Sequence, residues 1–282
     1  MSTSTFRIIP RLDIKGPNLV KGIKLEGLRA LGDPKDYLIK YYEEDADELI
    51  IQDVVASLYN RNNLSKIIEY ITSKVFIPIT VGGGLRSIDD IENILRSGAD
   101  KVSINSQGIK NPEIITNSVS QFGSSTIALS IEVIKYENRY LASYDNGREL
   151  TEINVFDWIK NAEELGIGEI ILTNVDFDGT SKGIDKKLIS KAREITNLPL
   201  LYHGGVSSFE DVYNIYDLGC NGAVIASCFH YHYLKKINGH IENKVEGNFD
   251  FIKNNITKNY NFNSFSIYDL KYFMKSKKVN IR

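Results

Sequence analysis

Residues 76–106, FIPITVGGGLRSIDDIENILRSGADKVSINS, recur in altered form as residues 197–227, NLPLLYHGGVSSFEDVYNIYDLGCNGAVIAS. A constant offset of 121 residues relates the two copies, and the same offset aligns ADELII with IGEIIL, with Glu48 on Glu169. Each copy carries a Gly-Gly turn between an apolar run and a helical pattern. Because an internal repeat dictates the architecture of a chain, this one predicts two similar half-barrels, each with its own anion site.

Short β-rich runs recur along the whole chain, and each is followed by a helical pattern that ends in or near glycine. The eight runs are RIIPRLDI, ELIIQDV, FIPITV, KVSIN, TIALSIEV, EIILTNV, LPLLYH and GAVIAS. Strands that alternate with helices indicate a parallel sheet. Eight such units predict an α/β fold with one (β/α)₈ TIM barrel spanning residues 1–282. In that fold ligands bind at the C-terminal ends of the strands.

Two stretches interrupt the regular alternation. The segment EVIKYENRYLASYDNGREL, which begins at Glu132, predicts a strand that continues into a hairpin with Asp-Asn-Gly as its turn. Residues 235–264 are polar and rich in Asn and Lys, and they favour an insertion before a last helix, IYDLKYFMKSKK. Both a tolerated surface excursion and a partner-binding role remain open for this insertion.

Composition sets limits on the function. The chain has 282 residues, 42% apolar and 25% charged, with a formal net charge of −2. This balance gives no reason to expect nucleic acid or an anionic membrane as a partner. No signal-peptide pattern or membrane-spanning run is evident, and the two cysteines, Cys220 and Cys228, suggest a reducing compartment. We therefore expect a cytoplasmic protein. The glycines form no dinucleotide-binding fingerprint and the histidines have no metal-ligand spacing, so no cofactor and no metal are predicted.

The glycine turns carry the strongest chemical signal. A glycine between a strand and a helix lets backbone N–H groups approach an oxyanion, and the following helix adds its positive end. The next strand end in each copy adds further amide and hydroxyl donors. The predicted phosphate ligands are Gly83, Gly84, Asn105 and Ser106 in one half and Gly204, Gly205, Ala226 and Ser227 in the other. The implied ligand carries a phosphate at each end and lies across the barrel mouth.

Acidic residues follow several strands. Asp13 ends the first strand and Glu132 the fifth, so the two carboxylates face each other across the mouth, an arrangement that suits general acid–base chemistry. Lys21 is a candidate cation for substrate or for orienting Asp13. Four further residues are predicted at the mouth, and each of them also fits a structural role such as a helix cap, a salt bridge or a wall contact: Asp53, Asp176, Asp178 and His203.

The motifs RIIPRLDIKGPNLVKG, LRALGDP, VGGGLRSIDDI, GADKVSINS, EIILTNVDFDGTSKG and HGG resemble the cyclase subunit of imidazole glycerol phosphate synthase. The resemblance covers most of the chain. It implies a (β/α)₈ barrel that joins ammonia to the bis-phosphorylated ribonucleotide PRFAR. The implied products are imidazole glycerol phosphate, used for histidine, and an aminoimidazole carboxamide ribotide. It also implies a heterodimer with a glutaminase subunit, which docks at the N-terminal face and sends ammonia through the barrel.

The resemblance also implies residue roles. Asp13 matches the catalytic aspartate of strand one, Asp178 falls within the substrate-binding motif NVDFDGT, and Asp100 matches a position at the glutaminase interface. The charged ring that gates ammonia entry is matched by Arg7, Glu48, Lys101 and Glu169, at the starts of four strands. Without the resemblance, these four residues would be interpreted as a salt-bridge layer that closes the bottom of the barrel.

Departures from the family pattern fall on the substrate side. Glu132 stands where the family has its second catalytic aspartate, residues 16–18 replace charged loop residues, and His203, preceded by Tyr202, replaces a small residue. Three hypotheses follow. The chain is the histidine-pathway cyclase, with Asp13 and Glu132 as acid and base; or it uses ammonia to amidate a nucleotide-linked sugar for surface polysaccharide; or it is a non-catalytic barrel that activates a glutaminase.

Overall fold

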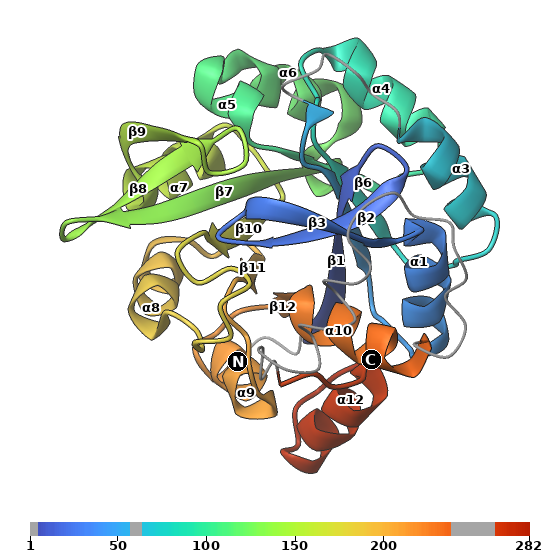
Figure 1. Cartoon of the computed structure of the whole chain (residues 1–282). Coiled ribbons are helices and arrows are strands. Elements are labelled where there is room, and N and C mark those ends of the chain that lie inside the picture. Colours follow the sequence, from blue (N-terminus) through green and yellow to red (C-terminus); the bar gives the residue numbers. More distant parts are fainter. Residues whose placement is uncertain (1–4, 57–63, 238–262) are drawn as a thin grey trace.

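The computed structural model describes residues 5–56, 64–237 and 263–282. Eight parallel strands form a closed barrel in the order β1-β4-β5-β6-β7-β10-β11-β12, with β12 pairing back to β1 and β7 pairing directly with β10. Helices surround the barrel on the outside (Figure 1). The predicted (β/α)₈ barrel is confirmed.

The barrel strands are β1 (Arg7–Lys15), β4 (Leu49–Asp53), β5 (Ile79–Gly82), β6 (Lys101–Ile104), β7 (Ile127–Tyr136), β10 (Glu169–Asn174), β11 (Leu200–His203) and β12 (Gly222–Ile225). The α-helices are α1 (Pro34–Glu43), α3 (Ser65–Thr72), α4 (Ile88–Arg96), α5 (Ser106–Lys110), α6 (Glu113–Phe122), α7 (Val155–Glu164), α8 (Lys186–Ile195), α9 (Phe209–Asp217), α10 (Ser227–Ile237) and α12 (Ile267–Ser276). A short 3₁₀ turn, η1 (Ser124–Thr126), precedes β7.

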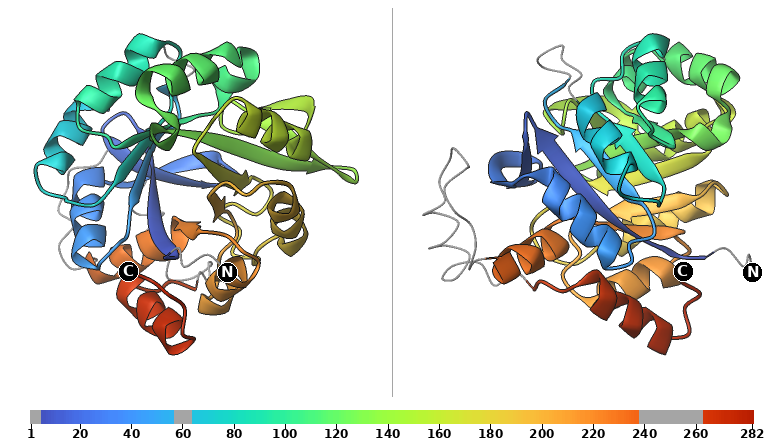
Figure 2. Two further views of the ribbon diagram at one scale, coloured as in Figure 1. Left: turned by 180° about the vertical axis from the view of Figure 1, so that it is seen from behind. Right: turned by 90° about the vertical axis from the view of Figure 1, so that its right-hand side faces the viewer.

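Two antiparallel extensions rise from the barrel mouth. The strand β1 continues into β2 (Asn18–Ile23) and β3 (Glu26–Gly32), and this hairpin lies over the C-terminal ends of the barrel strands (Figures 1 and 2). The predicted second extension is β7 with β8 (Arg139–Tyr144) and β9 (Glu149–Asn154). The Asp-Asn-Gly turn joins β8 to β9, whereas a turn at residues 137–138 joins β7 to β8. The β2–β3 hairpin is not predicted from the sequence.

The repeat in the sequence is also a repeat of local structure. Ser87 caps α4 by accepting a hydrogen bond from the Asp90 amide (3.1 Å), and Ser208 caps α9 through the Asp211 amide (3.2 Å). In both copies the N3 carboxylate also accepts a backbone N–H from the residues before the helix. Such caps satisfy amides that the first helical turn leaves unpaired. Both helices therefore begin at matching distances from their glycine turns.

The barrel interior is arranged in layers. Six small or aliphatic side chains, one from each of six strands, fill the interior at one level: Ile9, Ile50, Ala128, Ile171, Leu201 and Val224. Because side chains alternate along a strand, residues two and four positions from Ile9 on β1 also point inward, with Arg7 below this layer and Arg11 and Asp13 above it. The larger apolar core lies between the barrel and the surrounding helices.

The two ends of the described chain lie together at the bottom of the barrel, where the Phe6 amide donates to the Asn280 carbonyl (2.8 Å). Most of the insertion predicted for residues 235–264, namely residues 238–262, lies outside the described residues. Its flanks meet, because Lys235 Nζ donates to Ser264 Oγ (2.8 Å). No helix in the described part of the chain is long and apolar enough to cross a bilayer.

Candidate active site at the barrel mouth

The two glycine turns adopt the same backbone conformation. Gly83 and Gly84 have φ of 95° and 70°, and Gly204 and Gly205 have φ of 116° and 87°, all in the left-handed region that favours glycine. A Cβ on Gly205 would lie 1.9 Å from the Gly183 carbonyl oxygen. The sequence therefore places glycine where the backbone turns with positive φ and where another backbone segment approaches closely.

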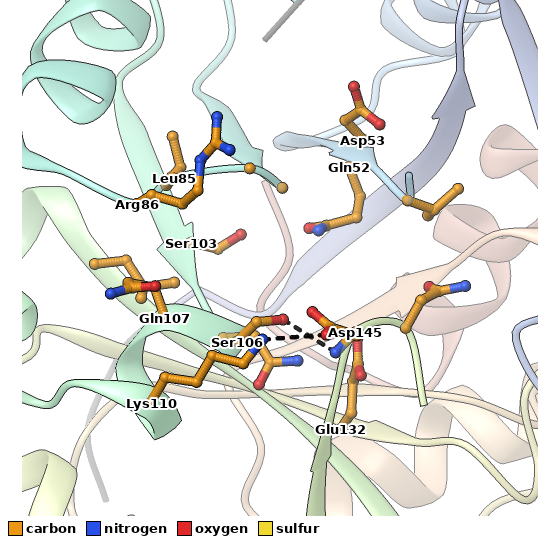
Figure 3. Close-up of a pocket in the computed structure, with 16 residues that line it drawn as sticks. Gln52, Asp53, Leu85, Arg86, Ser103, Ser106, Gln107, Lys110, Glu132 and Asp145 are labelled. Carbon is orange, nitrogen blue, oxygen red and sulfur yellow. Dashed lines mark hydrogen bonds and ion pairs between the residues drawn. The ribbon is translucent and has the colours of Figure 1, made fainter. Parts of the chain in front are cut away.

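A pocket forms at each turn. The first pocket contains four of the residues predicted as ligands, namely Gly83, Gly84, Asn105 and Ser106, together with Glu132 (Figure 3). The second contains the other four predicted ligands, Gly204, Gly205, Ala226 and Ser227. The structure thus brings all eight predicted phosphate ligands together in two groups.

Unpaired polar atoms gather in these pockets. Ser103 Oγ, Asn105 Oδ1 and Asp145 Oδ1 are buried without a hydrogen-bond partner, and all three residues line the first pocket. Ser181 Oγ is likewise unpaired and its residue lines the second. Since buried polar groups in folded proteins are almost always paired, these atoms point to a polar ligand.

The two pockets differ in charge. Arg86 and Lys110 line the first pocket, whereas no lysine or arginine occurs among the described residues that line the second. The second site therefore depends on backbone amides, a serine hydroxyl and the N-terminus of α10 for its attraction to an anion.

The predicted pair of carboxylates lies at the barrel mouth, with Glu132 in the wall of the first pocket, and both side chains are buried. Asp13 is 1% and Glu132 6% exposed. Arg11, which the sequence reasoning overlooked, donates from Nε to Asp13 Oδ1 at 2.8 Å. Its Nη1 lies 3.3 Å from Thr173 Oγ1 and 3.4 Å from His203 Nδ1, so the guanidinium crosses the barrel interior.

Lys21, on β2, contacts two acidic residues at the barrel mouth. Its Nζ donates to Asp178 at 2.6 Å and lies 3.9 Å from Asp13, with the lysine only 2% exposed. Both roles considered for Lys21 remain compatible with this position, because it faces Asp13 and the substrate side. His203 Nε2 lies 3.5 Å from Asp178 Oδ1. Burial, together with Arg11 and Lys21, holds the pKa of His203 well below its usual value, so the imidazole is neutral at physiological pH.

The two carboxylates have opposite proton affinities. Burial alone would raise the pKa of Asp13, but Arg11 and Lys21 outweigh it and hold that pKa below the ordinary aspartate value. Burial raises the pKa of Glu132 to about 7, against the opposing effects of the Gly147 amide, Arg11 and Asn105. Asp13 is therefore ionised at neutral pH, while Glu132 exchanges its proton there. A group with a pKa near the working pH is suited to general acid–base catalysis.

The four predicted gate residues meet at the bottom of the barrel. Glu48 accepts from Arg7 (2.7 Å), Lys101 (2.9 Å) and Thr80 (2.7 Å), and Glu169 accepts from both Arg7 and Lys101. The ring is complete and closes the interior below the apolar layer.

Other predicted positions have structural roles. Asp53 accepts the Val55 amide at 3.0 Å while it also lines the first pocket, and Asp176 accepts the Lys135 amide at 2.8 Å. Asp100 accepts the Ile79 amide at 2.9 Å at the N-terminal end of the barrel. The two cysteines are free and buried.

Sequence reasoning missed Arg11 and Lys110. For Arg11 a signal was available, because the β1 alternation that turns Asp13 inward also turns Arg11 inward. Lys110 lies one helical turn after Ser106, at the end of α5, so it shares the pocket of that serine. The i, i+4 spacing was therefore the signal for it.

This is the mouth of a (β/α)₈ barrel with two phosphate-type turns on either side of a pair of buried carboxylates. The class it defines is an enzyme that performs acid–base chemistry on a ligand with two anionic ends.

Comparison with known proteins gives the family. The family model described as "Histidine biosynthesis protein" matches residues 7–235. The imidazole glycerol phosphate synthase subunit HisF of Legionella pneumophila is 51% identical over 209 residues, covering 74% of this chain and 99% of that protein. The subunits HisF of Natranaerobius thermophilus and Thermobifida fusca are 42% and 41% identical, covering 80% of this chain and 90% of each relative. The chain belongs to the HisF family of histidine biosynthesis proteins.

Proposed function

We propose that this chain is the cyclase of an imidazole glycerol phosphate synthase. It joins ammonia to PRFAR and releases imidazole glycerol phosphate and aminoimidazole carboxamide ribotide. The observation that carries the proposal is the arrangement of the mouth, where two phosphate pockets flank an ionised Asp13 and a Glu132 with a pKa of about 7. The names of the HisF relatives support it.

Each part of the mouth has a task in this reaction. The phosphates of PRFAR fix its two ends, so that the reacting centre lies over the carboxylates. Addition of ammonia, closure of the imidazole ring with loss of water, and cleavage of a carbon–nitrogen bond all move protons. Glu132 accepts and returns protons, because its pKa lies near the working pH. Asp13 remains charged beside Arg11 and stabilises the positive charge that develops when ammonia adds.

We further propose that a glutaminase subunit supplies the ammonia from the N-terminal face of the barrel. The ring of Arg7, Glu48, Lys101 and Glu169 is the entry, and its opening exposes the apolar layer above it. Neutral ammonia crosses an apolar layer more readily than ammonium because desolvating a charge is costly. Binding at this face therefore delivers the reactive form of the nucleophile.

Turnover of PRFAR by the purified chain, with excess ammonium salt at alkaline pH, tests the cyclase. We expect conversion to imidazole glycerol phosphate, and we expect Glu132→Gln to lower kcat/KM by about 100-fold or more. Unchanged turnover in the Gln variant would remove Glu132 from the chemistry. An absence of turnover while PRFAR still binds would refute the cyclase and direct the search to amidation of sugar nucleotides, the acceptor class that the departures at Glu132 and His203 leave open.

A further inference from the structure

The turn formed by Asp145, Asn146 and Gly147 sits at the edge of the first pocket. All three residues have positive φ, at 53°, 61° and 77°. The Asp145 amide donates to Ser106 Oγ at 3.0 Å, and Lys110 Nζ donates to Asp145 Oδ2 at 3.2 Å (Figure 3). Asp145 therefore engages the serine through its backbone amide and the lysine through its carboxylate, at a site that is built to receive an anion.

The same turn also holds the titrating carboxylate. The Gly147 amide donates to Glu132 Oε2 at 2.8 Å. On its other side the turn is tied to the β2–β3 hairpin, because Asn146 Nδ2 donates to the Leu25 carbonyl at 2.9 Å. Three consecutive residues thus connect the first phosphate pocket, Glu132 and the hairpin over the mouth.

Asp145 carries an unbalanced charge in this position. Its Oδ1 is buried without a partner, and among the described residues its carboxylate pairs only with Lys110, whose side chain is 47% exposed. Arg148 donates instead to the backbone carbonyl of Asp145, at 3.2 Å. A phosphate that binds Ser106 would lie beside the Asp145 carboxylate, and neighbouring like charges repel each other. Lys110 would gain a dianion in place of a monoanion. Both effects favour displacement of Asp145 when a phosphate arrives.

We propose that Asp145 is an internal counter-ion of the first phosphate site and that an incoming phosphate displaces its carboxylate from Lys110. The turn of residues 145–147 then moves and withdraws the Gly147 amide from Glu132. Phosphate binding and the state of Glu132 are then linked through one short segment, and Lys110 is a further phosphate-binding residue. The inference rests on the phosphate sites of the proposed function and not on the identity of the ammonia acceptor.

Amide resonances recorded by NMR during a titration with inorganic phosphate test the proposal. The Gly84 amide reports the first site, Gly205 the second and Gly147 the contact with Glu132. In the unaltered protein we expect Gly147 to shift with the same midpoint as Gly84. A Gly147 resonance that stays fixed while Gly84 titrates would overturn the link, and this measurement needs no variant.

Asp145→Asn tests the counter-ion. Asparagine keeps the shape of the side chain and tolerates positive φ, so the turn is retained. We expect phosphate affinity at Gly84 to increase about tenfold, the size of a typical coupling between sites, and affinity at Gly205 to stay within about twofold. Glu137→Gln is the matched control, since it removes the same charge from the exposed far end of the β7–β8 hairpin, and it should leave both sites unchanged.

Lys110→Met tests the cation. We expect it to weaken phosphate at Gly84 at least fivefold without a change at Gly205. Unchanged or weaker binding at Gly84 in Asp145→Asn would refute the counter-ion role. If neither Gly84 nor Gly205 responds to phosphate, the anion sites themselves are wrong. If both respond but PRFAR is not converted, the cyclase fails while the counter-ion remains supported.

Discussion

Replacing Arg11 by methionine should cost about 3–5 kcal/mol of unfolding free energy at neutral pH. Arg11 and Asp13 are 2% and 1% exposed, and Nε lies 2.8 Å from Oδ1. Removing one partner of a buried ion pair leaves the other charge uncompensated, which typically costs this much. Coulomb's law gives a similar value, about 4 kcal/mol for unit charges 4 Å apart at an effective dielectric constant of 20. Lys21 compensates only in part, because its Nζ is 3.9 Å from Asp13 and already donates to Asp178 at 2.6 Å.

The assay is urea unfolding followed by circular dichroism, with two comparison variants. Arg96→Met removes an arginine from a pair with Glu92 in which the arginine side chain is 78% exposed, so we expect a change within about 0.5 kcal/mol. Arg11→Met combined with Asp13→Asn removes both charges and should recover most of the loss. A loss below about 1 kcal/mol for Arg11→Met, or no recovery in the double variant, would refute the assignment of Asp13 as an ionised partner.

The pH dependence of this loss has a definite sign. In the native protein the pKa of Asp13 lies below its unfolded value of about 3.9, so the carboxylate binds fewer protons in the folded state. Its contribution to stability is therefore fully present above about pH 4 and is lost as the pH falls through the folded pKa. The difference between the native protein and Arg11→Met should accordingly be largest at neutral pH and shrink below pH 4.

Three further outcomes are expected. The pH profile of cyclase turnover should have an apparent pKa near 7 that disappears in Glu132→Gln; a profile with the same midpoint in the variant would assign it to another group. Gly205→Ala should cost more than about 3 kcal/mol in thermal unfolding, because its Cβ would lie 1.9 Å from the Gly183 carbonyl oxygen. Gly16→Ala is the control and should cost about 1 kcal/mol, since Gly16 has φ of 60° and a Cβ there would have no atom within 4 Å. Equal losses would contradict the close approach at Gly205. Glu48→Gln should cost about 2–4 kcal/mol in urea unfolding, since Glu48 is only 1% exposed and its charge balances Arg7 and Lys101. A loss below about 0.5 kcal/mol would show that this charge does not stabilise the ring.

The sequence predicts the parts of the site that depend on local chain geometry. The two glycine turns, the serines after the next strands and the position of Asp13 at a strand end all follow from motifs within about ten residues, and the repeat specifies them twice. For this reason the eight predicted phosphate ligands gather in two pockets and the four predicted gate residues form one ring, while their roles stay predictions. The gate also required the family resemblance, because charged residues at four strand starts fit a structural ring equally well.

Contacts across the barrel could not be predicted in the same way. Arg11 meets His203 across 192 positions of sequence, and Asp145 meets Ser106 across 39. The first contact depends on the pairing of β12 with both β1 and β11, and the second depends on the conformation of a three-residue turn. The β2–β3 hairpin was missed because Gly16-Pro17-Asn18 indicates a loop, while the pairing with β1 that orders it depends on the tertiary fold.

The two halves of the barrel produce different proton affinities from equivalent positions. Ile9 and Ala128 lie in the same apolar layer, so Asp13 and Glu132, each four residues further along its strand, stand at the same height. Two residues before the carboxylate, however, β1 carries Arg11 and β7 carries Ser130. The guanidinium contacts Asp13 directly and keeps it ionised, whereas Glu132 has an uncharged residue beneath it and is dominated by burial. Cations on one side only, Arg11 with help from Lys21, therefore divide a symmetric pair into an ionised carboxylate and one whose pKa lies near 7.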